Sequence, residues 1–101
     1  MKKALYEILV PTFFGTNPKI IINTIKVWEN ELLLISRGLT KLPVVDGVWI
    51  NEGKEYFYKN TPYRVCVTLE ELNALLKLAK TLFNQITIMA YKISDDVIFY
   101  N

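Results

Sequence analysis

The sequence predicts an α+β fold in which two helices cover one face of a single antiparallel sheet. Two observations predict it: two amphipathic helical patterns, and apolar extended segments that precede and follow each of them. The order strand, helix, hairpin, strand, helix, strand, strand divides the 101 residues into two strand–helix–strand halves within one domain, residues 1–101. This order is typical of a ferredoxin-like fold. We then expect the first and third core strands to lie side by side at the centre, with the last core strand flanking the first.

The first strand and the first helix have clear boundaries in the sequence. Residues 4–10 are mostly apolar and are followed by proline, which predicts a strand. Asn17 can cap a helix, and Pro18 suits the first helical position. Gly38 is placed to end the helix, after Arg37, in the left-handed conformation. Apolar residues recur between these limits in steps of three and four, at Ile21, Ile25, Trp28, Leu32 and Ile35.

The segment between the two helices is rich in turn signals. Pro43 interrupts its first extended stretch, and Asp46-Gly47 predicts a turn. A polar turn at Asn51-Glu-Gly53 predicts a hairpin, although the sequence leaves open whether its second arm is a strand. Asn60-Thr61-Pro62 is expected to end that arm. The extended stretches expected here are residues 39–45, 48–50, 55–58 and 63–67.

The second helix begins with a capping box, because Thr68 can cap and Glu71 can reach back to it three residues later. Its apolar stripe predicts a helix that packs on one side. Residues 86–93 are expected to form the last core strand. After a turn, residues 97–100 are expected to add a short final strand to the sheet. The stripe of the second helix comprises Leu72, Leu75, Leu76, Ala79, Leu82 and Phe83.

The composition excludes several kinds of chemistry. The net charge of +2 and the absence of a basic run argue against nucleic-acid binding. Without histidine, the usual proton shuttle of neutral pH and the nitrogen ligands of most zinc sites are absent. The single cysteine, Cys66, cannot form a disulfide within the chain and is expected to be a buried small hydrophobe. We therefore expect a cytoplasmic protein with no cofactor, no metal and no membrane-spanning segment.

Glu7 is the first candidate binding residue. In the predicted sheet it lies at the middle of the central strand, with Arg64 on one neighbouring strand and Lys92 on the other. A carboxylate between two cations on the helix-free face could form a polar ligand site. It could equally be a cross-strand charge pair on a face that is solvated or covered by a second subunit.

The hairpin carries the second candidate cluster, in which aromatic rings alternate with cations. Such rings can stack on a flat base while the cations hold a phosphate. The same side chains could instead bury against a second copy of the chain. The candidate residues of this cluster are Trp49, Lys54, Lys59, Tyr63 and Arg64, with Tyr56 and Tyr58 between them. The loop from Thr12 to Thr16 is a weaker anion candidate, because any helix start offers free N–H groups.

The sequence resembles a group of small uncharacterised bacterial and phage proteins. The likeness rests on Gly38-Leu-Thr40, Gly47-x-Trp49, Gly53, the apolar strand after Pro62 and a helix that ends at Asn84-Gln85. The chain departs from the group at Lys59-Asn60, where an acidic or arginine-bearing segment is expected. The resemblance implies a ferredoxin-like layout and self-association, and it implies no activity.

These features together predict a small, non-catalytic, homo-oligomeric binding protein. We expect it to hold a small anionic or nucleotide-like ligand in a groove between subunits, lined by the hairpin. The 51% share of hydrophobic residues favours self-association in a chain of this size. Two alternatives stay open: a small enzyme that uses carboxylate and tyrosine chemistry, with Glu7 or Glu55 as base, and a purely structural oligomer or protein–protein interaction module. A phage or viral origin agrees with the resemblance.

Overall fold

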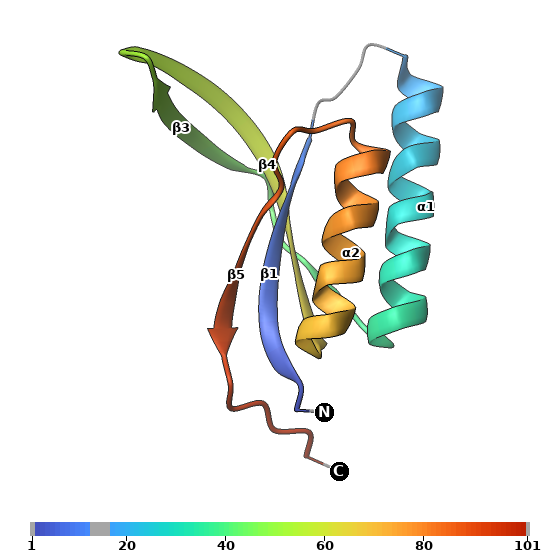
Figure 1. Cartoon of the computed structure of the whole chain (residues 1–101). Helices are drawn as coiled ribbons and strands as arrows, with labels where there is room; N and C mark the ends of the chain where they lie inside the picture. The colour runs from blue at the N-terminus through green and yellow to red at the C-terminus, as the bar shows by residue number, and fades with distance from the viewer. Residues whose placement is uncertain (1, 13–16, 101) are drawn as a thin grey trace.

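The computed structural model describes residues 2–12 and 17–100. Two helices lie side by side against one face of a single sheet, and a long hairpin projects from one end of that sheet (Figure 1). This arrangement confirms the predicted α+β fold with both helices on one face. The elements are β1 (Ala4–Pro11), α1 (Pro18–Ser36), β2 (Thr40–Lys41), β3 (Val45–Asn51), β4 (Lys54–Val67), α2 (Leu69–Leu82) and β5 (Met89–Ser94).

The sheet has the strand order β2–β4–β1–β5, and β3 also pairs with β4. All of these pairings are antiparallel. The two central strands, β1 and β4, are the first and third core strands of the predicted order. As expected, β5 flanks β1.

The largest departure from the sequence prediction is the length of β4. It continues through Asn60-Thr61-Pro62, which were expected to break the chain, and its outer half forms the second arm of the hairpin. Proline has no N–H, so it disrupts a central strand when that N–H is needed. The Pro62 carbonyl accepts the Leu42 N–H at 3.0 Å, so its missing N–H would point to the same side. That side of β4 faces the stretch between β2 and β3, where residues 42–44 are not in a strand, so at most one ladder bond is missing at the edge of the pairing. Asp46-Gly47, expected as a turn, is instead part of β3.

The end of α1 also differs from the expectation. Arg37, and not Gly38, takes the left-handed conformation, with φ of 66°. The Arg37 N–H bonds to the Leu33 carbonyl at 2.9 Å and closes the last turn. A positive φ is uncommon in residues other than glycine. This helix therefore ends on a strained backbone next to a glycine that could have avoided the strain.

The start of α2 confirms the capping box. The Glu71 N–H bonds to the Thr68 hydroxyl at 3.1 Å, and the Glu71 carboxylate accepts the Thr68 N–H at 2.9 Å. The last core strand is shorter than predicted and starts at Met89. Residues 97–100 form no strand, so the expected short final strand is wrong. They run past the end of the sheet that lies opposite the hairpin (Figure 1).

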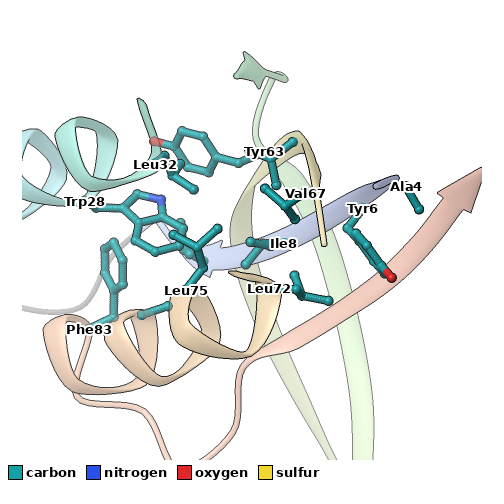
Figure 2. Close-up of a cluster of buried hydrophobic side chains, with 13 residues drawn as sticks. Ala4, Tyr6, Ile8, Trp28, Leu32, Tyr63, Val67, Leu72, Leu75 and Phe83 are labelled. Carbon is teal, nitrogen blue, oxygen red and sulfur yellow. The ribbon is translucent and has the colours of Figure 1, made fainter. Parts of the chain in front are cut away.

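The core lies between the helices and the sheet (Figure 2). At its centre the Trp28 ring meets Tyr63 and Phe83 edge to face, at centroid distances of 6.0 and 5.9 Å. Each of these three side chains is at most 1% exposed. Edge-to-face pairs stabilise by about 0.5–1.5 kcal/mol each beyond the burial of area. The remaining buried hydrophobic members are Ala4, Tyr6, Ile8, Val10, Leu32, Val65, Val67, Leu72, Leu75 and Ala79.

Candidate ligand-binding face

The face of the sheet opposite the helices, here called the open face, carries a buried carboxylate at its centre. Strand register places Glu7 between Arg64 of β4 and Tyr91 of β5. Arg64 Nε donates to Glu7 Oε1 at 2.8 Å, and the Tyr91 hydroxyl donates to Oε2. Glu7 is only 5% exposed, and each of its two carboxylate oxygens accepts a hydrogen bond from within the protein. We call these three residues the Glu7 cluster.

The electrostatics of the Glu7 cluster keep its carboxylate charged. Burial by itself raises the pKa of Glu7, but the hydrogen bonds from Tyr91 and Arg64 and the charge of Arg64 outweigh burial and lower it. The hydrogen bond to Glu7, together with burial, raises the pKa of Tyr91. At neutral pH the cluster therefore contains a carboxylate, a guanidinium and a neutral phenol.

Lys92 does not flank Glu7, contrary to the prediction. It pairs with Tyr6 and lies on the other face, where its Nζ is 5.9 Å from the Tyr6 ring centre. Its Nζ also forms an ion pair with Asp95 at 3.0 Å. A shift of one residue in register moves every side chain of a strand to the opposite face. Tyr91 takes the position expected for Lys92. The alternation of side chains within β5 does not by itself determine whether Tyr91 or Lys92 points toward Glu7.

Tyr63 is also misplaced by the sequence prediction, because it faces the helices. Its hydroxyl donates to Glu29 Oε2 at 2.5 Å, and Lys41 Nζ lies 2.9 Å from the same carboxylate. Burial and the Glu29 carboxylate raise the pKa of Tyr63. Burial favours a higher pKa for Glu29, but the contacts with Tyr63 and Lys41 lower it overall. Tyr63 is therefore a core residue that cannot touch a ligand on the open face.

The hairpin does present aromatic rings to solvent. Trp49 and Tyr56 stack at a centroid distance of 5.1 Å with 28° between their planes, and they are 51% and 43% exposed. Register places both on the same face of the sheet as Arg64. The next pair toward the body on this same face is Gly47 and Tyr58, in which the tyrosine ring occupies the space a side chain at Gly47 would need. Gly47 is thus required by the close approach of Tyr58.

The two candidate lysines of the hairpin have different surroundings. Lys59 Nζ forms an ion pair with Asp46 at 2.5 Å across the two strands. Lys54 pairs with Asn51 beside the turn, and its side chain is exposed. Lys59 is therefore held near the body of the molecule, and Lys54 stands at the hairpin tip.

An open groove of about 1160 Å³ separates the hairpin from the connection between α2 and β5. Trp49 and Lys59 line it, whereas Glu7 and Arg64 do not. Leu9 also lines the groove, and it follows Glu7 by two residues on the same face of β1, so the groove lies alongside the Glu7 cluster. The other lining residues are Pro11, Asp46, Gly47, Phe57, Tyr58, Asn60, Asn84, Gln85, Ile86, Thr87, Ile88 and Met89. We call this feature the hairpin groove.

A second, smaller recess of about 470 Å³ lies at the opposite end of the sheet, and we call it the basal recess. Arg64 and Cys66 both line it. Cys66 was predicted to be buried, but it is only half-buried. Sequence reasoning missed Arg37 and Lys3 here, although the chain has only two arginines and both line this recess. The remaining lining residues are Leu5, Ser36, Gly38, Leu39, Thr40, Val97 and Phe99.

Three further observations concern sites considered from the sequence. Across residues 2–12 and 17–100, no group of three or more Cys, Asp or Glu residues is arranged to hold a metal ion. None of the helices in the described part of the chain combines the length and apolarity that a membrane span needs. Residues 13–16 of the loop that was a weak anion candidate lie outside the described residues.

No protein-family model matches the chain, and no curated protein matches it. Solved structures do resemble it. CutA1 from Oryza sativa superposes with a TM-score of 0.62 at 14% identity, over 98% of this chain and 83% of the other. The divalent cation tolerance protein CutA1 from Thermus thermophilus gives 0.60 at 16% identity, over 98% and 87%. A phage SAM lyase in complex with S-methyl-5′-thioadenosine gives 0.58 at 14% identity, over 91% and 89%.

These likenesses agree with the strand order and the placement of both helices on one face of the sheet. One fold can carry many unrelated functions. At identities of 14–16%, the comparisons establish the ferredoxin-like α+β fold of this chain and nothing about its activity.

Proposed function

We propose that this protein is a small, non-catalytic, homo-oligomeric binding protein that holds a small anionic or nucleotide-like ligand. The ligand lies in the hairpin groove, and a second subunit closes the open side of that groove. Of the residues that line the groove, Trp49 supplies a stacking surface and Lys59 supplies positive charge, and Lys54 adds positive charge at the hairpin tip. Glu7 and Arg64 form the polar part of the site beside the groove.

The observation that supports a ligand in the groove is the exposed Trp49–Tyr56 stack. Trp49 lines the groove, and Tyr56 stacks on it from one side, so the other side of the Trp49 ring offers a flat surface to a base or another planar group. The groove volume is close to the range of about 300–1,000 Å³ that small-molecule sites commonly have. A phage protein of the same fold is in complex with S-methyl-5′-thioadenosine, which supports the choice of a nucleoside-like ligand and a phage origin.

Self-association is supported by the apolar side chains of the hairpin. Ile50 is 69% exposed and Phe57 is 79% exposed, on an arm that has no helix against it. Exposed apolar patches of this kind commonly mark an interface. The outer edges of β3 and β5 also have unpaired backbone groups, and a strand edge can add a strand from another copy. A single unpaired cysteine supports action in the cytoplasm.

Tryptophan fluorescence provides a direct test of the ligand site. Trp28 is fully buried, so a change in emission on adding ligand would come from Trp49. Titration with S-methyl-5′-thioadenosine and with AMP is expected to quench the emission with saturation. Trp49→Phe should abolish that response, and Arg64→Ala should weaken binding at least about tenfold. Unchanged affinity in both Trp49→Ala and Arg64→Ala, across a panel of nucleotides, would refute the proposal.

Native mass spectrometry of freshly purified protein separates the proposal from a purely structural oligomer. A multiple of the subunit mass together with the mass of a retained small molecule is expected. A bare oligomer that binds none of the titrated compounds would favour the structural alternative. A monomer at micromolar concentration would refute the intersubunit groove.

An enzyme that uses carboxylate and tyrosine chemistry is the second candidate, and the Tyr91–Glu7 hydrogen bond is the observation in its favour. Because its pKa is lowered, Glu7 is ionised at neutral pH and could act as a base. Both of its oxygens already have partners, so it could accept a proton from a bound molecule only if Tyr91 or Arg64 moved aside. Incubation with SAM, followed by mass spectrometry, decides between the two candidates. Turnover with a bell-shaped pH profile that is lost in Glu7→Gln would establish the enzyme, and the binding proposal expects no turnover.

A further inference from the structure

We propose that the basal recess is a second binding site, distinct from the hairpin groove, and that it takes a small phosphate monoester with an apolar body. The recess lies on the open face beyond the Glu7 cluster, between β4 and the chain that follows α1. Figure 1 shows the start of β1 and the segment that follows β5 at this end of the sheet, opposite the hairpin.

The first argument is the distribution of arginine. The chain has 12 cationic residues, of which only Arg37 and Arg64 are arginines, and both line this recess. A guanidinium presents planar, paired donors that match a phosphate, which a lysine ammonium does not. Arg64 is fixed through Nε by its bond to Glu7 Oε1 at 2.8 Å. Among the described residues, the two terminal nitrogens of Arg64 have no hydrogen-bond or ion-pair partner, so they remain available to an anion.

The second argument is the backbone of Arg37. It takes φ of 66° although Gly38 follows directly and would adopt that conformation without strain. A strained backbone persists only where the surrounding structure determines it, and such positions cluster at functional sites. Arg37 lines the basal recess, so this strained position lies at the proposed site. Its guanidinium is exposed and forms no ion pair with any described carboxylate.

The third argument is the balance of charge around the recess. Lys3, Arg37 and Arg64 line it, and none of its lining residues is acidic. Glu7 pairs with Arg64 and offsets its charge. The hydrogen bonds with Thr68 and, to a smaller extent, the charge of Lys3 lower the pKa of Glu71. Arg37 is therefore the least compensated of the three cations. The carbonyl end of α1 also faces this region, but the Arg37 N–H and the Ser36 hydroxyl bond to the Leu33 and Leu32 carbonyls. A phosphate monoester carries a charge of about −1.5 to −2 at neutral pH, which suits a recess lined by cations and by no carboxylate.

The walls of the recess indicate the rest of the ligand. Leu5, Leu39, Val97 and Phe99 contribute apolar surface beside the cations. Phe99 is 76% exposed, so its ring is open to contact with a flat or apolar group. Cations at one side and apolar side chains at the other fit a small molecule whose phosphate is attached to a ring or short apolar body.

Titration followed by two-dimensional NMR tests the proposal on the full chain. The probes are phenyl phosphate, inorganic phosphate and benzoate, each added at constant ionic strength. We expect phenyl phosphate to shift the amide signals of Gly38, Thr40 and Cys66 most strongly, with inorganic phosphate weaker and benzoate weakest. Benzoate as strong as phenyl phosphate would replace the phosphate class by a carboxylate. Shifts spread over all lysine-bearing surfaces would overturn the site.

Arg37→Gly provides a variant that separates binding from folding. Glycine relieves the positive φ, so the Tm should stay the same or rise, while phenyl phosphate binding weakens at least tenfold. Arg37→Lys, which keeps the charge but loses the planar donors, should weaken binding several-fold. Lys26→Ala removes the same charge from an exposed position of α1 outside both recesses and should leave affinity unchanged. Equal losses in Arg37→Gly and Lys26→Ala would overturn the proposal in favour of general charge attraction.

Arg64 belongs to both proposed sites, so Trp49 and Arg37 are the residues that distinguish the hairpin groove from the basal recess. Trp49→Ala should leave phenyl phosphate affinity unchanged, and Arg37→Gly should leave the Trp49 fluorescence response unchanged. If the recess were covered by a second copy of the chain, the Gly38 and Thr40 signals would change with protein concentration and phosphate would not bind. That result would also overturn the site.

Discussion

The two tryptophans of this protein lie in opposite surroundings. Trp28 is fully buried between the helices and the sheet and meets two aromatic rings edge to face. Trp49 is half exposed on the hairpin and stacks on a single ring. The first has enough neighbours within one subunit to explain its presence, and the second does not.

This difference separates a body with a buried aromatic core from a hairpin whose aromatic rings remain exposed to solvent. Hydrophobic side chains are stabilising where they leave water, at roughly 25 cal/mol per Å² of apolar area. Outside the hairpin, α1 also leaves Ile20, Ile22 and Leu34 more than half exposed, but the body has a fully buried apolar core. The hairpin leaves Val48, Ile50 and Phe57 more than half exposed, and none of its described residues is fully buried. The comparison predicts that mutations in the body will reduce the stability of the subunit, and that mutations in the hairpin will reduce what the subunit binds.

The largest expected effect is that of Trp28→Ala. Truncation of a fully buried aromatic residue removes its contacts and leaves a cavity, so we expect a loss of about 3–5 kcal/mol in the free energy of unfolding. Trp28 Nε1 is buried without a hydrogen-bond partner among the described residues, so Trp28→Phe loses no polar contact and should cost about 1–2 kcal/mol. Urea unfolding followed by circular dichroism measures both. A loss below about 1 kcal/mol for Trp28→Ala would break the comparison.

Acidification should have the next largest effect, through Glu7. Its pKa is lower in the folded protein than in the unfolded chain, so its stabilisation is fully present above the unfolded value of about 4.3. That stabilisation is lost as the pH falls through the lower, folded pKa. Glu7→Gln leaves Arg64 without its carboxylate and should lower the free energy of unfolding at pH 7 by about 2–3 kcal/mol.

The pH dependence itself provides the control. Urea unfolding from pH 3 to pH 7 should show a shallower loss of stability for Glu7→Gln than for the unmodified protein. Glu29, whose pKa is also lowered, accounts for part of the remaining slope. Identical slopes for the two proteins would mean that the Glu7 cluster makes no net contribution.

Gly47→Ala should have a moderate effect that is confined to the hairpin. The added methyl group would overlap the Tyr58 ring, which must then rotate away, at a cost of about 1–2 kcal/mol. Hydrogen exchange should show reduced protection in β3 and unchanged protection in α2. The double variant Gly47→Ala with Tyr58→Ser removes the overlap and should recover most of the loss. If the double variant does not recover stability, the loss in Gly47→Ala arises from the backbone of the hairpin and not from the overlap with Tyr58.

The smallest expected effect on stability is that of Trp49→Ala. It removes one stacked pair at an exposed position, so the free energy of unfolding of the dilute protein should fall by less than about 1 kcal/mol. Analytical ultracentrifugation should show a clear weakening of self-association in the same variant. A large loss in the free energy of unfolding with unchanged self-association would mean that Trp49, like Trp28, stabilises the fold and does not contribute to an interface.

Sequence reasoning predicted the parts of the fold that depend on local signals. The Thr68 capping box, the helix start at Pro18 and the central pairing of the first and third core strands follow from short-range patterns, and the structure confirms them. The continuation of β4 through Pro62 could not be predicted in this way. It depends on where the neighbouring edge is interrupted, which is a property of the assembled sheet.

The candidate site was less predictable because it depends on the register between distant strands. The Glu7–Arg64 pairing was expected and is present, but the prediction that Lys92 faces Glu7 was off by one residue, and Tyr91 stands there. No turn connects β1 to β5 directly, so the sequence contains no signal that sets their register. Tyr63 was assigned to the ligand face because its aromatic ring was grouped with the hairpin, whereas its partner is Glu29 of α1.

The unbroken course of β4 restricts how the hairpin can evolve. Fourteen residues alternate without interruption from the tip of the hairpin to the centre of the sheet. Inserting a single residue into the outer half would turn Tyr56 and Tyr58 to the reverse side while leaving Arg64 in place. Related proteins are therefore expected to lengthen or shorten this hairpin by even numbers of residues in each strand.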